Sequence, residues 1–374
     1  MSFELPEHTV ALVVGGRRYV GWESVSIARS IESAGWTFQL GLYQGAAASD
    51  PAVIRPQSLC VVTLDGSPVI TGYVDEVEVT GAADRTDMPV TGRSKTSDLV
   101  DCSPDPDGTK RWRNATVTMI AAELAAQYGV DVVAEVDAGR PLDRFALEKT
   151  ETVYDAIERA AGLRSLLVTD DATGRLVLTR ASTRRIDATL TAGSNVTRWS
   201  AAFRGQDRFS DYICRGQRAA SPTIGADQAQ LVEGRATDGT SRTRRLVIAP
   251  EGRSDPAACL ERARWEMLTR YGRSTSVSVT VPGWTCGAGV VWPVNRLVRV
   301  RLPAALIDDD LLIVSASFRR DLQGTSTDLV LQPAEAFAQF TPPGTGRRGA
   351  RAPKGFWLSA PDVAAAQARA RANQ

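Results

Sequence analysis

The sequence predicts a mainly β protein with an α+β insert, and three observations lead to this fold class. Apolar residues alternate with polar ones over residues 1–100 and again from about residue 186, which is the period of a β-strand. Between these blocks, residues 101–185 change to the spacing of amphipathic helices. At 374 residues, of which 43% are hydrophobic and 23% charged, the chain is globular and long enough for two or three domains.

The first block, residues 1–100, is predicted to form an N-terminal β-barrel domain. Alternating apolar residues over 10–14 lead into Gly15-Gly16, which is a hairpin signal. Apolar and polar residues alternate again over residues 36–42 and over 68–80, and in the second segment valines alternate with glutamates over residues 76–79. One apolar and one charged face indicate a sheet with one solvent-exposed face, and the pattern is typical of a small barrel or a sandwich.

The second block, residues 101–185, is predicted to form a compact α+β domain. Thr116 is a candidate N-cap for a first helix, and a second helix is expected to start at Thr150 and to end before Gly162. Strands are expected beside these helices at residues 130–136, 163–168 and 176–178.

The third block, residues 186–340, is predicted to form a second β-barrel domain with one helix at 255–271. Asp255 is the expected N-cap of that helix, and Pro256 suits its first position because a proline needs no hydrogen-bond partner there. Residues 341–374 begin with Pro and Gly and are rich in Arg, so we expect a flexible basic C-terminal tail. The strand candidates of the block are residues 199–203, 209–214, 273–281, 296–301, 311–318 and 328–331.

Residue usage argues against catalysis, and we predict no catalytic, cofactor-binding or metal-binding residue. His8 is the single histidine and is expected at an unstructured end, so we expect His8→Ala to leave function intact. The five cysteines show no C-x-x-C pair and are read as reduced, small apolar residues of a cytoplasmic chain. A net charge of +1 gives no reason to expect nucleic-acid binding, and neither a Sec-type signal nor a membrane-spanning run is recognisable.

Three motifs resemble functional sites but have simpler interpretations. Residues 344–349 match the dinucleotide fingerprint, yet they lie in a linker and not between a strand and a helix. Residues 103–114 resemble a calcium loop but lack the first and the twelfth carboxylate. Asp308-Asp309-Asp310 is expected to be a solvent-exposed turn.

Aromatic residues provide the candidates for partner binding. Phe356 and Trp357 stand in a Pro/Gly-rich linker without a core of their own, so we expect them to dock on a neighbouring surface. Trp284 and Trp292 flank a Gly-rich segment and belong either to the core or to an interface. We assign Trp292 to the core and Trp284 to an interface.

Longer segments carry a resemblance to a known family. Residues 62–75 (VTLDGSPVITGYVD) and 90–102 (VTGRSKTSDLVDC), followed downstream by 281–284 (VPGW), 291–293 (VWP) and 333–337 (PAEAF), resemble phage Mu-like baseplate hub proteins. The resemblance covers roughly residues 5–340, and none of its motifs is catalytic.

This resemblance implies a homotrimer in the baseplate of a contractile tail. Each protomer would supply two tail-tube-like barrels, so that three chains form a pseudo-sixfold ring between the hexameric tail tube and the trimeric central spike protein. Its partners would be the spike and the tail tube or adjacent baseplate proteins, with no small-molecule substrate and no cofactor. The protein would be assembled in the host cytoplasm and reside in the virion.

Two other function classes make different demands on the sequence. A tail-associated enzyme that cleaves peptidoglycan would need a cleft with paired carboxylates, and no distinctive pair is recognisable. A nucleic-acid-binding module would need a basic face on the folded body, whereas the basic excess lies in the tail.

Overall fold

The computed structural model describes residues 8–43, 54–81, 86–104, 110–217, 231–240, 242–250, 255–287 and 289–337. These residues form two compact units. Of the described residues, unit 1 contains those up to Phe203, those from Gly272 to Leu302 and those from Asp308 on, and unit 2 contains those of 204–271 together with the short segment 303–307. In the described part of the chain, no helix is long and apolar enough to span a membrane. Strands outnumber helices in the described residues taken together, which confirms the predicted mainly β fold class.

The first barrel of unit 1 is antiparallel throughout, with the strand order β3-β4-β9-β6-β5-β1-β2. β1 also contacts β3, so the sheet curls back on itself. The predicted hairpin at Gly15-Gly16 is confirmed, because both glycines adopt the positive φ that a tight turn between β1 and β2 requires. The strands are β1 (Val10–Val14), β2 (Arg17–Tyr19), β3 (Trp22–Ser30), β4 (Thr37–Tyr43), β5 (Leu59–Leu64), β6 (Ser67–Val77) and β9 (Val90–Ser94), with the small pair β7 (Thr80–Gly81) and β8 (Thr86–Asp87) beside them.

The second barrel has the strand order β15-β21-β22-β23-β20-β16. Its strands are β15 (Arg185–Thr191), β16 (Arg198–Phe203), β20 (Thr275–Pro282), β21 (Leu297–Leu302), β22 (Ile307–Asp321) and β23 (Gly324–Gln332), with short 3-10 helices at Pro303–Ala305 and Ala334–Phe337. This order repeats β1-β5-β6-β9-β4-β3 of the first barrel, except that β15 runs parallel to β21 whereas β1 runs antiparallel to β5. In both barrels the long strand, β6 or β22, pairs with the strand before it on one side and with β9 or β23 on the other, and the ladder to β9 or β23 contains a bulge.

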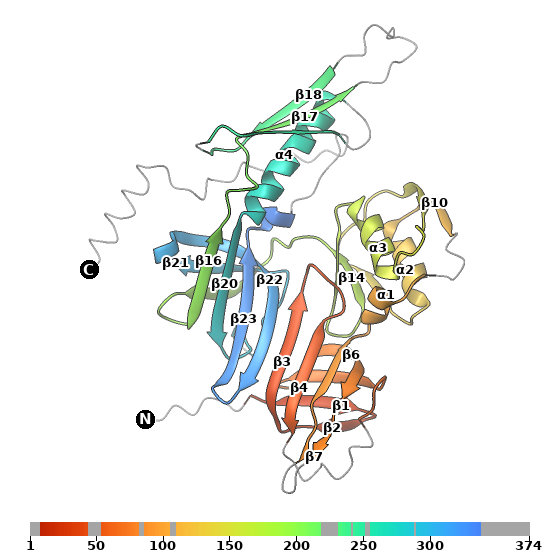
Figure 1. The fold of residues 1–374 in the computed structure, drawn as a ribbon, viewed down its shortest axis with the longest axis vertical. Coiled ribbons are helices and arrows are strands. Elements are labelled where there is room, and N and C mark those ends of the chain that lie inside the picture. Colours follow the sequence, from red (N-terminus) through yellow and green to blue (C-terminus); the bar gives the residue numbers. More distant parts are fainter. Residues whose placement is uncertain are drawn as a thin grey trace, which may run out of the picture. The chain divides into compact units, whose positions relative to one another are not determined.

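The two barrels are joined into a single sheet by one strand pair. β3 of the first barrel runs antiparallel to β22 of the second, with a register from Ser30 opposite Ser315 to Val25 opposite Arg320. Figure 1 shows these strands, red and blue, side by side although they come from opposite ends of the sequence. The described strands of both barrels therefore form one sheet of 13 strands.

The α+β insert lies between the two barrels in the sequence. It contains α1 (Ser97–Asp101), α2 (Val117–Ala126) and α3 (Val153–Gly162), with the strand pair β10 (Arg111–Ala115) and β12 (Leu142–Ala146) and the sheet β11 (Val132–Ala134), β14 (Leu176–Thr179) and β13 (Leu167–Asp170). Thr116 caps α2, as predicted, by accepting a hydrogen bond from Met119 N at 3.2 Å. The second helix begins later than Thr150, because Thr152 and Asp155 form a capping box that fixes its start.

A buried carboxylate attaches the insert to the first barrel. Asp170 at the end of β13 is 4% exposed and accepts hydrogen bonds from Gly35 N (3.0 Å), Trp36 N (3.1 Å), Thr96 Oγ1 (2.6 Å) and the Ser94 hydroxyl. Burial raises the pKa of Asp170, whereas its four donors act to lower it. Because every donor comes from the barrel or its link to α1, this side chain fixes the approach of the insert.

Unit 2 is a three-stranded sheet packed on one helix. β17 (Asp211–Gln217) lies between β18 (Leu231–Thr237) and β19 (Arg245–Ile248), and α4 (Pro256–Arg273) packs against them through buried Cys259 and Ala263. Asp255 caps the helix as predicted, with its Oδ1 2.9 Å from Ala258 N. The sequence placed these residues inside one domain over 186–340, whereas the structure separates residues 204–271 as a compact unit that interrupts the second barrel between β16 and β20.

The Asp170 contacts lead to a stability prediction. Asp170→Asn should lower the free energy of unfolding by about 2–3 kcal/mol. The substitution replaces one of the two accepting carboxylate oxygens by an NH₂ group, so some of the four buried donors lose their acceptor. The matched control is Asp143→Asn, which changes an exposed carboxylate on β12 of the same insert and should cost about 0.5 kcal/mol or less. Urea denaturation of both variants measures the difference. Equal losses would contradict the role given to Asp170.

Candidate interaction surfaces

One face of the continuous sheet is open to solvent and carries mostly small polar side chains. The opposite face packs in the barrel cores, so the alternation of the strands places hydroxyl groups on the open side. Ser26 lies opposite Gln39, which in turn lies opposite Thr91, and Ser317 lies opposite Asp328, which lies opposite Thr280. Further members of this polar face are Ser278 and Ser315.

The charges on the polar face are largely compensated. Arg319 lies 3.2 Å from Asp328, which also accepts a hydrogen bond from Thr280 Oγ1 at 2.6 Å. Arg93 contacts two carboxylates, with Nε 2.8 Å from Asp75 Oδ2 and Nη2 2.8 Å from Asp101 Oδ2. The face is therefore hydrophilic without a strong charge of either sign.

Several strand edges of this sheet have no partner among the described residues. β2 and β15 each pair with one strand, and two further edges, which we call the two free edges, lie on β16 and beyond β6. β16 pairs with β20 on one side only. The other free edge continues β6 beyond its bulge, over residues 76–81, where β9 and the segment before it cover one side only. Val79 on this edge is 54% exposed. Unpaired edges of this kind invite pairing with another chain.

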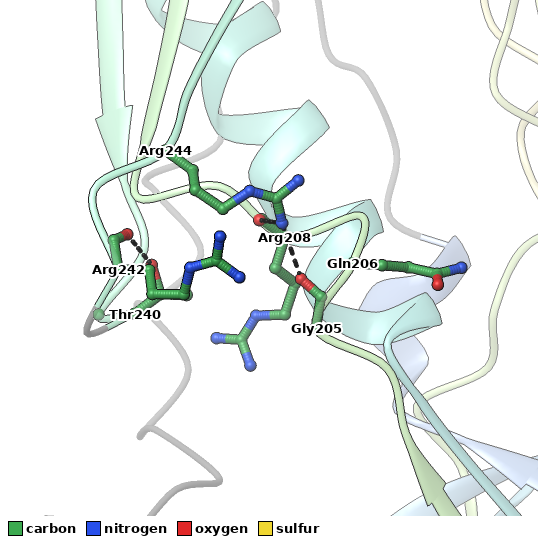
Figure 2. Close-up of a pocket in the computed structure, with 7 residues that line it drawn as sticks. Gly205, Gln206, Arg208, Thr240, Arg242 and Arg244 are labelled. Carbon is green, nitrogen blue, oxygen red and sulfur yellow. Dashed lines mark hydrogen bonds between the residues drawn. The ribbon is translucent and has the colours of Figure 1, made fainter.

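A pocket lined by arginines lies in unit 2 between two loops, residues 204–208 and 239–244. Figure 2 shows Arg208, Arg242 and Arg244 from these loops around the same space. At its floor, the buried guanidinium of Arg208 binds Asp238 through two hydrogen bonds of 2.7 and 2.8 Å. Arg244 Nη1 donates to the carbonyls of Gly205 (3.0 Å) and Arg208 (2.9 Å). The sequence analysis missed this pocket, because arginines 34 to 36 residues apart form no motif.

The predicted interface role of Trp284 needs correction. Trp284 is fully buried and its Nε1 donates to the Arg319 carbonyl at 3.1 Å, so it belongs to the core of unit 1, as does Trp292. His8 is not at a free end: its ring lies 5.0 Å from the Trp284 ring and its Nδ1 lies 2.8 Å from Asp65 Oδ2. The ring of His8 thus covers part of Trp284.

The remaining candidates of the sequence analysis divide into two groups. Asp308, Asp309 and Asp310 lie in strand β22 and not in a turn, although Asp308 and Asp309 are exposed as expected. Arg299 and Arg301 on β21 form ion pairs with Asp308, and Arg185 on β15 forms one with Asp310. The tail 341–374, with Phe356, Trp357 and the glycine motif at 344–349, lies outside the described residues, and so do residues 105–109 of the calcium-like loop 103–114.

The described residues offer little for catalysis or cofactor chemistry. No three His, Cys, Asp or Glu side chains among them gather into a group that could hold a metal ion. The arginine pocket has no carboxylate in its lining, and two further surface pockets have one each, Asp328 and Glu135. None of the three therefore has the carboxylate pair that glycoside hydrolysis requires. All five cysteines are free thiols, and burial raises the pKa of Cys60 to about 12.

Comparison with known families gives three consecutive matches. Residues 9–94 match the family described as Mu phage baseplate assembly protein GpP-like, N-terminal. Residues 96–180 match baseplate hub protein gp44-like, second domain, and residues 255–339 match Mu phage baseplate assembly protein GpP, fourth domain.

Relatives along nearly the whole chain agree with these matches. Baseplate hub protein gp44 of Escherichia phage Mu is 33% identical over 340 residues, which cover 88% of this chain and 89% of that protein. The 43 kDa tail protein of prophage MuSo2 from Shewanella oneidensis is 32% identical with a TM-score of 0.75, over 88% of this chain and 99% of that one. A tail protein from Neisseria meningitidis MC58 shares the fold, with 21% identity and a TM-score of 0.71 over 88% and 98% of the two chains.

The core position of Trp284 predicts the effect of its removal. Trp284→Ala should lower the free energy of unfolding by about 3–5 kcal/mol, because it leaves a large cavity beneath His8. The control Val290→Ala changes an exposed residue of the same loop and should cost about 0.5 kcal/mol or less. Thermal melting measures both. If Trp284→Ala melts like the wild type but assembles less well, the residue is part of an interface after all.

Proposed function

Because the chain belongs to the family of Mu-like phage baseplate hub proteins, we propose that it forms a trimeric ring that joins the hexameric tail tube to the trimeric central spike. The family membership makes it a structural component of the phage tail. The ring, its two attachment partners, its assembly in the host cytoplasm and the lack of enzymatic activity are our proposals.

The observation that carries the ring is the repeated strand order of the two barrels. The pair β3–β22 joins the first barrel to the second within one chain. In the repeat, β3 corresponds to β16 and β22 corresponds to β6. The two free edges are therefore the counterparts of the two strands that already pair. If β16 of one protomer pairs with β6 of the next in the same way, every barrel has the same two neighbours. Three chains then supply six quasi-equivalent barrels, so the ring can match a sixfold-symmetric partner on one side and a threefold-symmetric partner on the other.

The bulges of the two long strands give this junction a register. When the bulge at Val74/Glu76 is superposed on that at Ile313/Ser315, Val79 takes the place of Phe318. Phe318 pairs with Ile27, and the same ladder places Ala201 of β16 where Ile27 lies in β3. Val79 of one protomer is thus expected opposite Ala201 of the next.

Burial supports this correspondence. Phe318 is 0% exposed beneath its neighbour β3, whereas Val79, at the equivalent place, is 54% exposed in the single chain. By the same superposition, Val77 takes the place of Ala316. Ala316 is buried, whereas Val77 is only partly buried in the single chain. An incoming β16 strand, with partly exposed Ala201 and Phe203 on the same side, would cover both valines.

The polar face supports a conduit through the ring. If all the strands of the sheet face the ring axis on this side, the lumen is lined with serine, threonine and glutamine and with compensated charges. Such a surface is well hydrated and offers neither an apolar patch nor a strong field to hold a passing polymer. A passage through the tail tube needs a wall of this kind.

The first test of the ring is the mass of the purified protein. We expect light scattering to give about 120 kDa, three times the 40.2 kDa of the chain, because two free edges per protomer are satisfied only when the ring closes. A strictly monomeric protein at tens of micromolar, in low and in moderate salt, would contradict the proposal.

A disulfide cross-link tests the junction itself. In the double variant Val79→Cys/Ala201→Cys, the two cysteines lie directly opposite each other across the protomer boundary, at the Cα separation of ~4.5–5.5 Å found for paired strand residues, which suits a disulfide. Mild oxidation should yield covalent dimers and trimers on a non-reducing gel.

The matched control is Val20→Cys/Ala201→Cys, which places an exposed cysteine away from the free edge of β6. It should stay monomeric on the gel. Trimers in solution without cross-links in the Val79/Ala201 variant would retain the ring but reject this register.

A further inference from the structure

We propose that the arginine pocket of unit 2 binds an acidic, extended segment of a neighbouring tail protein, and that Arg242 and Arg244 hold a carboxylate of that segment. The proposal concerns residues 204–248 and does not depend on the ring.

The charge of the pocket calls for an anion. Of its three arginines, Arg208 has its own carboxylate partner in Asp238. Within the described residues, no carboxylate forms an ion pair with Arg242 or Arg244. Two guanidinium groups of like charge therefore face one concavity without a counter-ion from the described residues, and an anion bound between them would reduce their repulsion.

The pocket is also organised in advance of binding. Arg244 is fixed by its two hydrogen bonds to main-chain carbonyls, and its guanidinium lies 4.5 Å from the centre of the Phe209 ring. Its Nη1 is engaged, which leaves the remaining N–H groups for a ligand. Arg242 is exposed at the rim and, in Figure 2, its guanidinium points into the same space. Paired N–H donors of this kind match the two oxygens of a carboxylate.

A strand edge that starts at the pocket indicates a peptide and not a small anion. Residues 242–244 lead directly into β19, which pairs with β17 on one side and with no other described strand. Val247 on β19 is 54% exposed, whereas Leu246 and Ile248 pack toward α4. An extended segment could add to this edge through main-chain hydrogen bonds, cover Val247 and place an acidic side chain among the arginines.

The size of the pocket agrees with this ligand. Its volume of about 580 Å³ far exceeds that of an inorganic oxyanion, and glycines 205 and 239 in its lining leave the backbone accessible. A carboxylate on a side chain, with part of its own backbone, fills such a space better than a free ion does.

The experiment measures binding of a short fluorescein-labelled peptide of alternating valine and glutamate to the full-length protein by fluorescence anisotropy. Arg242→Gln should weaken binding about tenfold or more, because it removes a charge-assisted contact to the peptide. The substitution breaks no ion pair within the described residues, so the fold should be unaffected. Arg264→Gln, the same change on the exposed side of α4 outside the pocket, should alter the affinity by about twofold or less. A valine and glutamine peptide should not bind.

Three results would overturn the proposal. These are an Arg242→Gln variant that binds the acidic peptide as the wild type does, equal binding of the glutamine peptide, and tighter binding of inorganic phosphate than of the acidic peptide, which would make the pocket a site for a free anion. Light scattering of Arg242→Gln separates this site from the ring, because a variant that loses the peptide but keeps the wild-type mass affects the pocket alone.

Discussion

The architecture of unit 1 depends on one set of main-chain hydrogen bonds, those between β3 and β22. They turn two barrels into one sheet, align the polar sides of both barrels on a single face and leave β16 and the end of β6 as the free edges. Side-chain contacts then secure the rest. Asp170 fastens the insert to the first barrel, and Asn295 fastens the segment after the insert to the second, by accepting from Ser182 N at 2.9 Å and donating to the Arg180 carbonyl.

Features with a local cause could be predicted from the sequence. The turn at Gly15-Gly16 and the caps at Thr116 and Asp255 each depend on a few consecutive residues, and all three are present. The separate unit at 204–271 could not be predicted, because its strands alternate in the same way as those of the barrel that it interrupts. The aspartates at 308–310 were misjudged for a related reason, since their arginine partners lie on other strands and only pairing brings them together.

The interaction surfaces were beyond local reasoning as well. Trp284 is a large aromatic residue beside a Gly-rich segment, which suggested an interface. One of the residues that bury it, His8, is nearly three hundred residues away in the sequence, so local patterns could not reveal this contact. The two free edges follow from the strand order and not from composition. The repeat of the barrels is likewise a property of the strand order. The alternation of apolar residues indicates two β-rich blocks but not the order in which their strands pair.

The β3–β22 pair also has a consequence for how the chain is made. Ser30 leaves the ribosome long before its partner Ser315, and at ~5–20 residues per second the interval is roughly 15–60 s. During that time the first barrel can fold but exposes the edge of β3 to other nascent chains on the same message. A foreign β22 can occupy that edge, which would yield swapped oligomers instead of closed rings. Infrequent initiation on the message or chaperoned synthesis is therefore expected to favour correct particles, and strong overexpression to favour aggregates.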